Sequence, residues 1–329
     1  MEHMKVQCCV RSDDPPERLT YLKQMNIDNC YLMFTDAHSN YDDANRAIDR
    51  IRKAGITIND AGNDHIYKHP SIHLGLPDRD DWIEKYNALN RVIGNAGIPV
   101  GYMTWDTGRV STTRWAAGAH SHGAVVRIVD MAEIGARAPA FDRVYEEEEL
   151  WENFRYWWKA AEPVCREVGL RVALHPNDPP APHYEGCASL IHSADSYHRA
   201  IAEVGNSPVL GIKFCVGCWL EGGMAFGNVL DDLKSFIDDD RVLIVHFRNV
   251  SATLPYFEET LLEDGYMDMF AVMRRLVESG YHGAIHVDHV PRFDAGIGGQ
   301  STAWAYSTGY MKGLLAAAEH LRAGEATGH

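Results

Sequence analysis

The sequence lacks the features that mark membrane proteins and nucleic-acid-binding proteins. No apolar run approaches the roughly 20 residues that a membrane-spanning helix needs. No block of Lys and Arg is present, and 46 acidic residues against 31 basic ones give a formal net charge of −15. Binding of nucleic acid needs clustered cations that neutralise phosphates, so the charge also disfavours a metal-dependent nuclease. We expect neither a membrane nor a nucleic-acid partner, and an anionic ligand would need a few well-placed local cations.

Two further signatures are missing. No G-x-G-x-x-G motif follows an apolar segment, which weakens a dinucleotide-binding hypothesis. No leader is apparent, since MEHMKVQCCV runs directly into a strand-like segment.

The seven cysteines are odd in number, as expected for a protein of the reducing cytoplasm. Cys215 and Cys218 form a C-x-x-C without the second pair typical of structural zinc, so we interpret Cys218 as a neighbour only.

Short apolar runs alternate with longer amphipathic stretches along the chain. The expected strands are 6–10, 30–34, 56–59, 99–105, 171–175, 209–215, 242–247 and 284–288. The expected helices are 15–25, 41–54, 79–96, 146–168, 189–204, 228–237, 267–279 and 303–322. Strict βα alternation predicts a parallel sheet. We therefore expect a single (β/α)₈ TIM barrel with a parallel eight-stranded sheet, with an open doubly wound sheet as the alternative.

The domain organisation follows from the same pattern. No linker or change in composition divides the chain, so we expect one TIM-barrel domain over residues 1–329. A long loop insertion, residues 106–145, follows the fourth strand. Loops of this length are usually functional, and this one would cover the mouth of the barrel.

Four consecutive predicted strands end in residues that bind metals. The fifth, sixth and seventh end in His175, Cys215 and His246, and the eighth ends in Asp288, followed by His289. Active sites of TIM barrels lie at the carboxyl ends of the strands, so these side chains are expected at one rim. Imidazole, thiolate and carboxylate are ligands of divalent transition metals. The sequence therefore predicts a metal site formed by His175, Cys215, His246 and Asp288.

Several segments resemble the mannonate dehydratase family of the xylose-isomerase-like TIM barrels. The resemblance covers about residues 55–315 and is carried by HLGLPDRD, AGIPV, ALHPNDPP, IKFCVG, VHFRNV, DGYMDM, VDHVP and GYMKGLL. It implies that the same four side chains bind the metal and that His289 is catalytic. A catalytic tyrosine is also implied, with Tyr306 and Tyr310 as candidates, although both could equally be helix core residues. The last strand departs from the family pattern, since His286 and Val287 precede Asp288 in place of Arg-Pro.

The resemblance implies dehydration of a sugar acid, D-mannonate to 2-keto-3-deoxy-D-gluconate. The reaction takes a proton from C2 and expels the C3 hydroxyl, and a metal would act as Lewis acid. His289 is the candidate for one of the two proton transfers. The family favours Mn²⁺ or Mg²⁺, whereas a Cys ligand favours softer ions such as Zn²⁺ or Fe²⁺, and Co²⁺ is a further alternative.

An anionic sugar acid requires polar and cationic partners. Arg248 follows the seventh strand, and Arg114 lies in the insertion in a segment that resembles the family, which makes it preferable to Arg109. Asn177 and Asp178 follow His175 and could orient it or bind substrate hydroxyls, or simply form a turn. We predict substrate binding by Arg114, Arg248, Asn177 and Asp178.

Two alternatives stay open. The first is a sugar isomerase or epimerase of the xylose-isomerase-like barrels, in which a Cys ligand would be unusual. The second is a non-catalytic, metal-stabilised binding barrel. A homo-oligomer, dimer or tetramer, is expected by analogy with many barrels.

Overall fold

The core is a parallel sheet that closes on itself. The computed structural model describes residues 3–35, 41–107 and 111–327. Its sheet has the strand order β1-β14-β12-β11-β8-β5-β4-β3-β2. The edge strands β1 (Lys5–Val6) and β2 (Cys8–Arg11) are separated by Gln7 alone, and they pair with β14 and β3 respectively. Both edges therefore belong to one segment, which closes the sheet into a TIM-barrel fold, as predicted.

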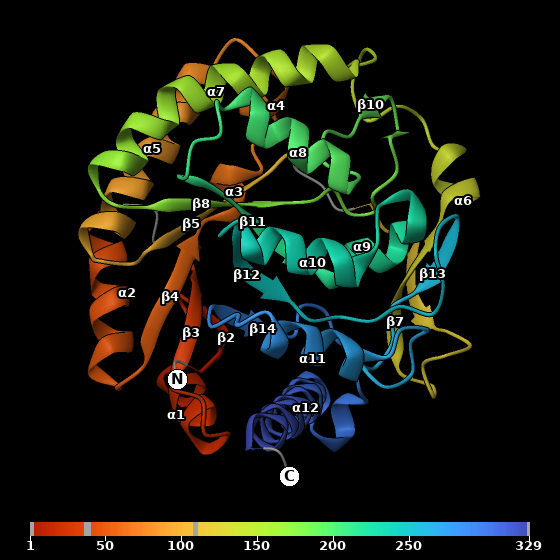
Figure 1. The fold of residues 1–329 in the computed structure, drawn as a ribbon. Coiled ribbons are helices and arrows are strands. Elements are labelled where there is room, and N and C mark those ends of the chain that lie inside the picture. The colour runs from red at the N-terminus through yellow and green to blue at the C-terminus, as the bar shows by residue number, and fades with distance from the viewer. Residues whose placement is uncertain (1–2, 36–40, 108–110, 328–329) are drawn as a thin grey trace.

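The remaining elements match the expected alternation within a few residues. The other barrel strands are β3 (Asn29–Met33), β4 (Thr57–Gly62), β5 (Val100–Thr104), β8 (Arg171–His175), β11 (Leu210–Cys215), β12 (Val242–His246) and β14 (Ala284–His286). The outer helices, which surround the sheet in Figure 1, are α1 (Pro16–Gln24), α2 (Tyr41–Lys53), α5 (Arg79–Asn95), α7 (Glu147–Glu167), α8 (Ala194–Glu203), α10 (Val229–Asp238), α11 (Met269–Glu278) and α12 (Gly299–Thr327). Short helices α3 (Asp64–Tyr67), α4 (Pro70–Leu74) and α9 (Val216–Gly222) lie in loops at strand ends.

Helix α7 illustrates how the sequence specifies the outer layer. Three glutamates, 147–149, fill its first turn, where the helix dipole favours negative charge. Its aromatic residues Trp151, Phe154 and Trp157 recur at helical spacing and are fully buried. Phe154 and Trp157 pack edge-on against Trp105, which follows β5, with ring centroids 5.2 and 5.8 Å apart. This aromatic cluster is therefore barrel packing.

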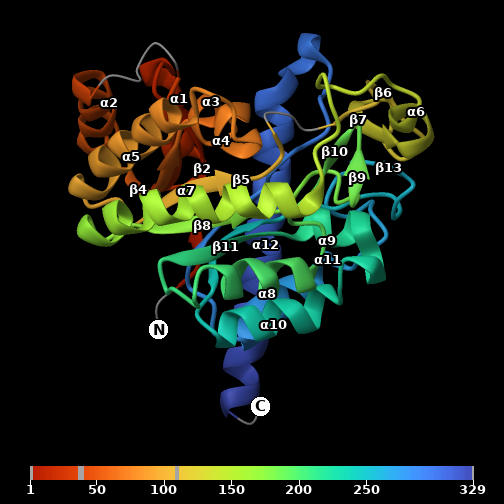
Figure 2. The ribbon, with the colours of Figure 1, turned by 90° about the horizontal axis from the view of Figure 1, so that it is seen from above.

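The insertion predicted after the fourth expected strand is confirmed. It follows β5 and contains strands and a helix of its own. Strands β6 (Arg114–Ala117) and β7 (Val125–Asp130) and helix α6 (Met131–Gly135) lie within it. Strand β7 also pairs, antiparallel, with β13 (Tyr256–Glu258). This partner lies more than 100 residues further along the chain, so local pattern could not reveal the pairing. Figure 2 shows the small sheet beside the barrel, next to α9.

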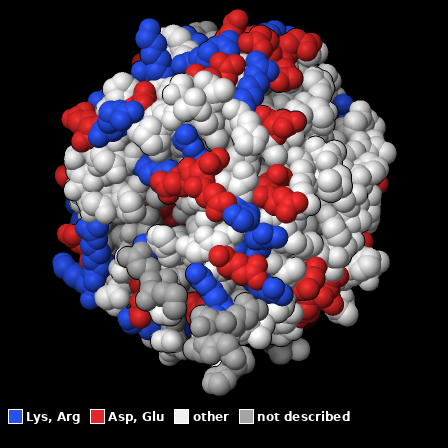
Figure 3. All heavy atoms as spheres, viewed as in Figure 1, with Lys and Arg blue, Asp and Glu red and all other residues white. Residues whose placement is uncertain are grey.

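Charges are mixed over the surface. On the face seen in Figure 3, Lys and Arg side chains are interspersed with Asp and Glu. Within residues 3–35, 41–107 and 111–327, no helix has the length and apolar character required to cross a bilayer.

His73 in α4 gives the fold a predicted sensitivity to acid. The side chain is fully buried, donates through Nε2 to the carbonyl of Tyr67 at 3.0 Å and packs on Trp105. Burial lowers the pKa of His73 to about 3. The folded protein therefore keeps this ring neutral, whereas the unfolded chain takes up a proton near pH 6.5. Because the unfolded state then binds more protons, stability falls as the pH falls below that value.

We expect this single group to remove about 1.4 kcal/mol of stability per pH unit below roughly pH 6. The decrease in melting temperature between pH 7.5 and 5.5 should be smaller in His73→Gln than in the unmodified protein. The exposed His183→Gln serves as control and should follow the unmodified protein. Equal decreases in all three proteins would show that His73 does not contribute.

Candidate metal centre and active site

The four predicted ligands lie together at the carboxyl end of the barrel. His175, Cys215 and His246 are the last residues of β8, β11 and β12, and Asp288 follows β14 by two residues. The parallel register places Cys215 beside His246. One ligand atom from each side chain lies within 4.8 Å of the others. Parallel strands end at the same rim, which is why residues more than 100 positions apart meet here.

The histidines have nitrogens available for a metal. The carbonyl of Pro176 can only accept, so Nδ1 of His175, at 2.7 Å, carries the hydrogen, and Nε2 has a free lone pair. The buried His246 has no hydrogen-bond partner for either ring nitrogen among the described residues, although Nδ1 lies 3.2 Å from Oδ1 of Asp288. Buried polar nitrogens without a partner are rare and costly. A bound cation would satisfy one of the two.

The acidic ligands are predisposed to be anions. Burial by itself would raise the pKa of the Cys215 thiol, but the Cys218 thiol and the Arg248 guanidinium lower it well below its usual value. Burial likewise opposes ionisation of Asp288, yet His246 and His289 hold the pKa of this carboxyl well below its ordinary range. Two imidazoles, a thiolate and a carboxylate suit a divalent transition metal. The residues present therefore fit a metal ion.

His289 lies beside this group with a fixed orientation. Its Nδ1 is 2.6 Å from Oε1 of Glu259, and its Nε2 is 3.8 Å from Oδ1 of Asp288. Burial would lower the pKa of His289, but the carboxylates of Asp288 and Glu259 outweigh it and raise the pKa to about 9. The side chain is 34% exposed. Glu259 therefore holds one ring nitrogen and leaves Nε2 to interact with other groups.

Arg248, predicted to bind substrate, lies among buried carboxylates. Its side chain is 1% exposed and forms ion pairs with Asp178 at 3.2 Å, Glu221 at 2.5 Å, Glu259 at 3.3 Å and Asp288 at 3.2 Å. Its guanidinium donors are thus directed at protein carboxylates, one of them a metal ligand. This arrangement favours a role in holding Asp288, and contact with substrate stays a prediction.

A second arginine completes this network. Arg127 of β7 is also 1% exposed and lies 2.7 Å from Asp178, 3.1 Å from Glu259 and 3.7 Å from Glu221. The insertion is thereby joined electrostatically to the loops behind the metal ligands. Arg127, Glu221 and Glu259 could not be predicted from the sequence, because their partners come from three distant segments.

We expect Arg248→Met to destabilise the fold strongly. Removing the cation leaves three of the four buried carboxylates with Arg127 alone and Asp288 without an arginine partner, which costs about 3 kcal/mol or more. Urea unfolding followed by circular dichroism would measure the loss. Arg114→Met is the control, since Arg114 is exposed, and its change should be about 0.5 kcal/mol or less. Equal stability of the two variants would contradict this view of the network.

The other predicted substrate residues have defined partners. Asn177 is buried, donates to the carbonyl of Trp105 at 2.9 Å and accepts from the amide of Ile191 at 2.9 Å. It thus fixes the loop after β8. Arg114 is exposed on β6 and pairs with Glu133 at 2.6 Å. Arg109 lies outside the described residues.

The candidate tyrosines lie on α12. Tyr306 is 46% exposed and donates to Glu263, and this hydrogen bond, with burial, raises the pKa of Tyr306 to about 12. Tyr310 is half-buried and packs against the hydrophobic core. Neither belongs to the described residues that line the cavity at the metal ligands. A catalytic role for either stays a prediction.

A cavity of about 260 Å³ opens at the metal ligands. Besides the ligands and His289, it is lined by the cations Arg11, Lys68 and Lys213. None of these three cations was predicted from the sequence. Lys213 could have been found from strand periodicity, because it precedes Cys215 by two residues and so shares its face.

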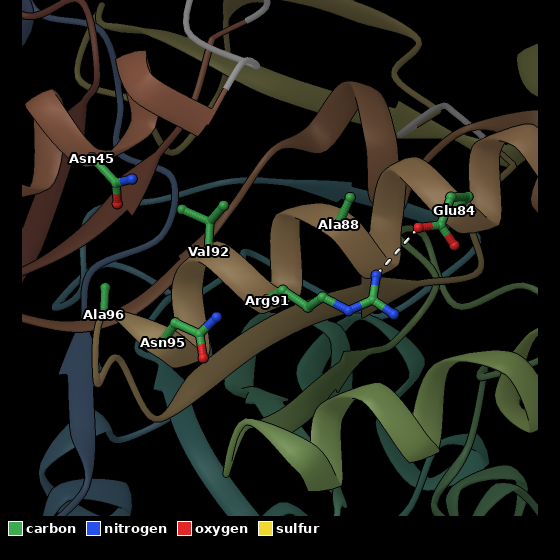
Figure 4. A pocket seen from close by; sticks show the side chains of 7 residues that line it. All are labelled: Asn45, Glu84, Ala88, Arg91, Val92, Asn95 and Ala96. Carbon is green, nitrogen blue, oxygen red and sulfur yellow. Dashed lines mark hydrogen bonds and ion pairs between the residues drawn. The ribbon is translucent and has the colours of Figure 1, made fainter.

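Larger hollows lie elsewhere. One of about 850 Å³ lies beside α11 and α12. Another of about 390 Å³ lies between α2, which contributes Asn45, and α5, where Glu84 and Arg91 pair at 3.2 Å (Figure 4). None of the four predicted metal ligands lines either hollow. We therefore place the active site at the smaller cavity.

Comparison with known proteins points to one family. The model of the D-mannonate dehydratase (UxuA) family matches residues 127–324. A mannonate dehydratase of Lactococcus lactis subsp. lactis (strain IL1403) is 28% identical over 278 residues, which cover 73% of this chain and 75% of the relative. One of Streptococcus pneumoniae (strain 70585) is 30% identical over 247 residues, covering 67% of this chain and 66% of that protein.

Solved structures show the same fold. The crystal structure of mannonate dehydratase from Streptococcus suis serotype 2 is similar with a TM-score of 0.86 at 24% identity, covering 98% of this chain and 95% of that one. The 3-keto-D-glucoside 4-epimerase YcjR of E. coli is similar with a TM-score of 0.65 at 14% identity, covering 94% and 99%. At these identities the likeness concerns the fold alone.

Proposed function

The chain belongs to the D-mannonate dehydratase (UxuA) family of hydro-lyases, and we propose that it converts D-mannonate to 2-keto-3-deoxy-D-gluconate and water. The observation that carries this proposal is the convergence of His175, Cys215, His246 and Asp288 on one cavity, with His289 beside them. Binding sites with convergent polar groups and perturbed pKa values are the usual location of catalysis.

The proposed chemistry needs a Lewis acid and two proton transfers. A divalent ion held by the four ligands would supply the Lewis acidity that stabilises negative charge on the substrate. We propose Mn²⁺, with Mg²⁺, Fe²⁺, Co²⁺ and Zn²⁺ as alternatives that the same donors accept.

The chain's own residues would move the protons. Elimination of water requires a base for the C2 proton and an acid for the departing C3 hydroxyl. His289 takes part in one transfer through Nε2, because Glu259 occupies Nδ1 at 2.6 Å. The ion pair between Arg248 and Asp288 holds that ligand in place, so His289 and the metal ligands keep a fixed relation.

Location and assembly are part of the proposal. Among the described residues all seven cysteines are free thiols, which supports a reducing cytoplasmic location. By analogy with many barrels, we propose a homo-oligomer, a dimer or a tetramer.

A substrate panel tests the proposed reaction. Protein stripped with a chelator and reloaded with Mn²⁺ would receive D-mannonate, D-altronate, D-galactonate and, separately, D-fructose. We expect a 2-keto-3-deoxy acid from D-mannonate and slower or no reaction with the other acids. Protein that binds metal but epimerises or isomerises the ketose and dehydrates no acid would contradict the proposal and favour a sugar isomerase or epimerase.

A further inference from the structure

Lys213 places a cation inside the barrel at the active-site cavity. It lies in β11, two residues before Cys215, so both side chains project to the same side of the sheet. The residue is 7% exposed. It lines the cavity together with His175, His246 and Asp288. An amine in this position is directly accessible to a molecule bound at the metal ligands.

The ammonium of Lys213 has no hydrogen-bonded or ion-paired anion among the described residues; burial lowers the pKa of Lys213, and the more distant carboxylates of Asp60 and Asp288 oppose this only in part. Its Nζ lies 3.8 Å from the centroid of the Tyr102 ring, and no hydrogen bond or ion pair joins it to any other described residue. The buried carboxylate of Asp60 is engaged elsewhere: Oδ2 accepts from Gln7 at 2.8 Å and Oδ1 accepts from the Tyr102 hydroxyl. Three N–H donors are therefore unused.

An unpaired ammonium inside a barrel is unfavourable. Transfer of a charge from water into a protein interior is costly unless it is paired and hydrogen-bonded, and the face of one aromatic ring compensates only in part. Positions where such a cost persists are found mainly at functional sites. The missing anion is therefore expected from a ligand.

The other cations at the cavity are already paired. Lys68 lies 3.6 Å from Asp106, and the exposed Arg11 lies 3.5 Å from Asp13. Arg248, behind the ligands, interacts with four carboxylates. Among the described lysines and arginines that line the cavity, Lys213 is thus the one without an ion pair.

We propose that Lys213 is a specificity-determining residue, which binds the carboxylate of an open-chain sugar acid in this cavity. The inference rests on the proposed function and deepens it. Neutral sugars and sugar alcohols present hydroxyl groups to the same donors but no charge. Lys213 therefore selects aldonates over the neutral sugars that isomerases and epimerases use, because a charge-assisted hydrogen bond is about twice as strong as a neutral one.

Lys213→Met is the variant of choice, since the side chains have similar length and the charge is removed. If Lys213 served the fold, its loss would lower the melting temperature. Because the ammonium is unpaired, we expect the melting temperature to stay unchanged or to rise. Lys213→Arg, which keeps the charge, and the exposed Lys234→Met on α10 complete the set.

Calorimetry with two probes tests the assignment. Each variant would be combined with His289→Ala, so that D-mannonate is not consumed, loaded with Mn²⁺ and titrated with D-mannonate and with its neutral analogue D-mannitol. We expect Lys213→Met to weaken D-mannonate binding by about tenfold or more, with D-mannitol binding and metal content unchanged. Lys213→Arg should keep most of the preference for the acid, and Lys234→Met all of it.

Equal affinity of the parent and Lys213→Met proteins for D-mannonate would overturn the assignment, as would a parallel loss of D-mannitol binding. The result is independent of turnover. Lys213-dependent binding of D-mannonate in a protein that fails to dehydrate it would uphold the role of Lys213 and reject only the proposed reaction.

Discussion

Replacement of His289 by alanine is expected to lower kcat for D-mannonate roughly 1000-fold, the usual contribution of a positioned acid or base. The ring lies at the cavity, with Nδ1 held by Glu259 and Nε2 3.8 Å from the ligand Asp288. It contributes no atom to the group of metal ligands, so metal content should be unchanged. Steady-state kinetics together with metal analysis of the same preparations would measure both quantities.

The exposed His183→Ala is the control and should keep full activity. A loss of metal in parallel with activity would show that His289 supports the metal site and does not transfer a proton. If the activity of His289→Ala were within threefold of that of the unmodified protein, His289 would have no catalytic role.

Replacement of Cys215 by alanine is expected to weaken metal binding on the order of 1000-fold, since even residues that only support ligands contribute 10- to 100-fold. The thiol is fully buried, and the Cys218 thiol and the Arg248 guanidinium, 3.6 Å away, lower its pKa well below the usual value. Competition with a metallochromic chelator would measure the affinity, and dehydratase activity should fall with occupancy.

Cys218 offers a matched control three residues further along the chain. Cys218 is equally buried, but it is not one of the four residues, Cys215 among them, whose ligand atoms converge. We expect Cys218→Ala to weaken metal binding by only about tenfold, the lower end of what a residue that supports a ligand contributes, through its contact with the Cys215 thiol. Equal losses in the two variants would contradict the assignment of Cys215 as the ligand.

The barrel and the metal ligands could be predicted because their signals are local. Each of the last four barrel strands is a short apolar run that leads to a potential metal ligand, and the fold brings those ends to one rim. His175, Cys215 and His246 could therefore be placed together from the order of the strands alone. The parallel sheet then brings the carboxyl ends of these strands to the same rim.

The surroundings of the site could not be predicted in the same way. The charge network joins Arg127 from the insertion to Asp178, Glu221 and Glu259 from three other loops, and no spacing in the sequence relates them. Arg248 had the right position for substrate binding, yet its burial and its four carboxylate partners depend on those loops. Lys213 was not predicted because it lies two residues inside β11, whereas only the ends of strands were assigned to the rim of the barrel.

The central claim is that the four ligands hold one divalent ion on which dehydration of a sugar acid depends. The most direct measurement is to titrate Mn²⁺ into chelator-stripped protein and to follow bound metal and the rate of 2-keto-3-deoxy acid formation from D-mannonate in the same samples. We predict that the rate rises in proportion to occupancy and saturates at one ion per chain, and that Cys215→Ala shows neither change over the same range. Full activity in the stripped protein, or no product at full occupancy, would contradict the claim.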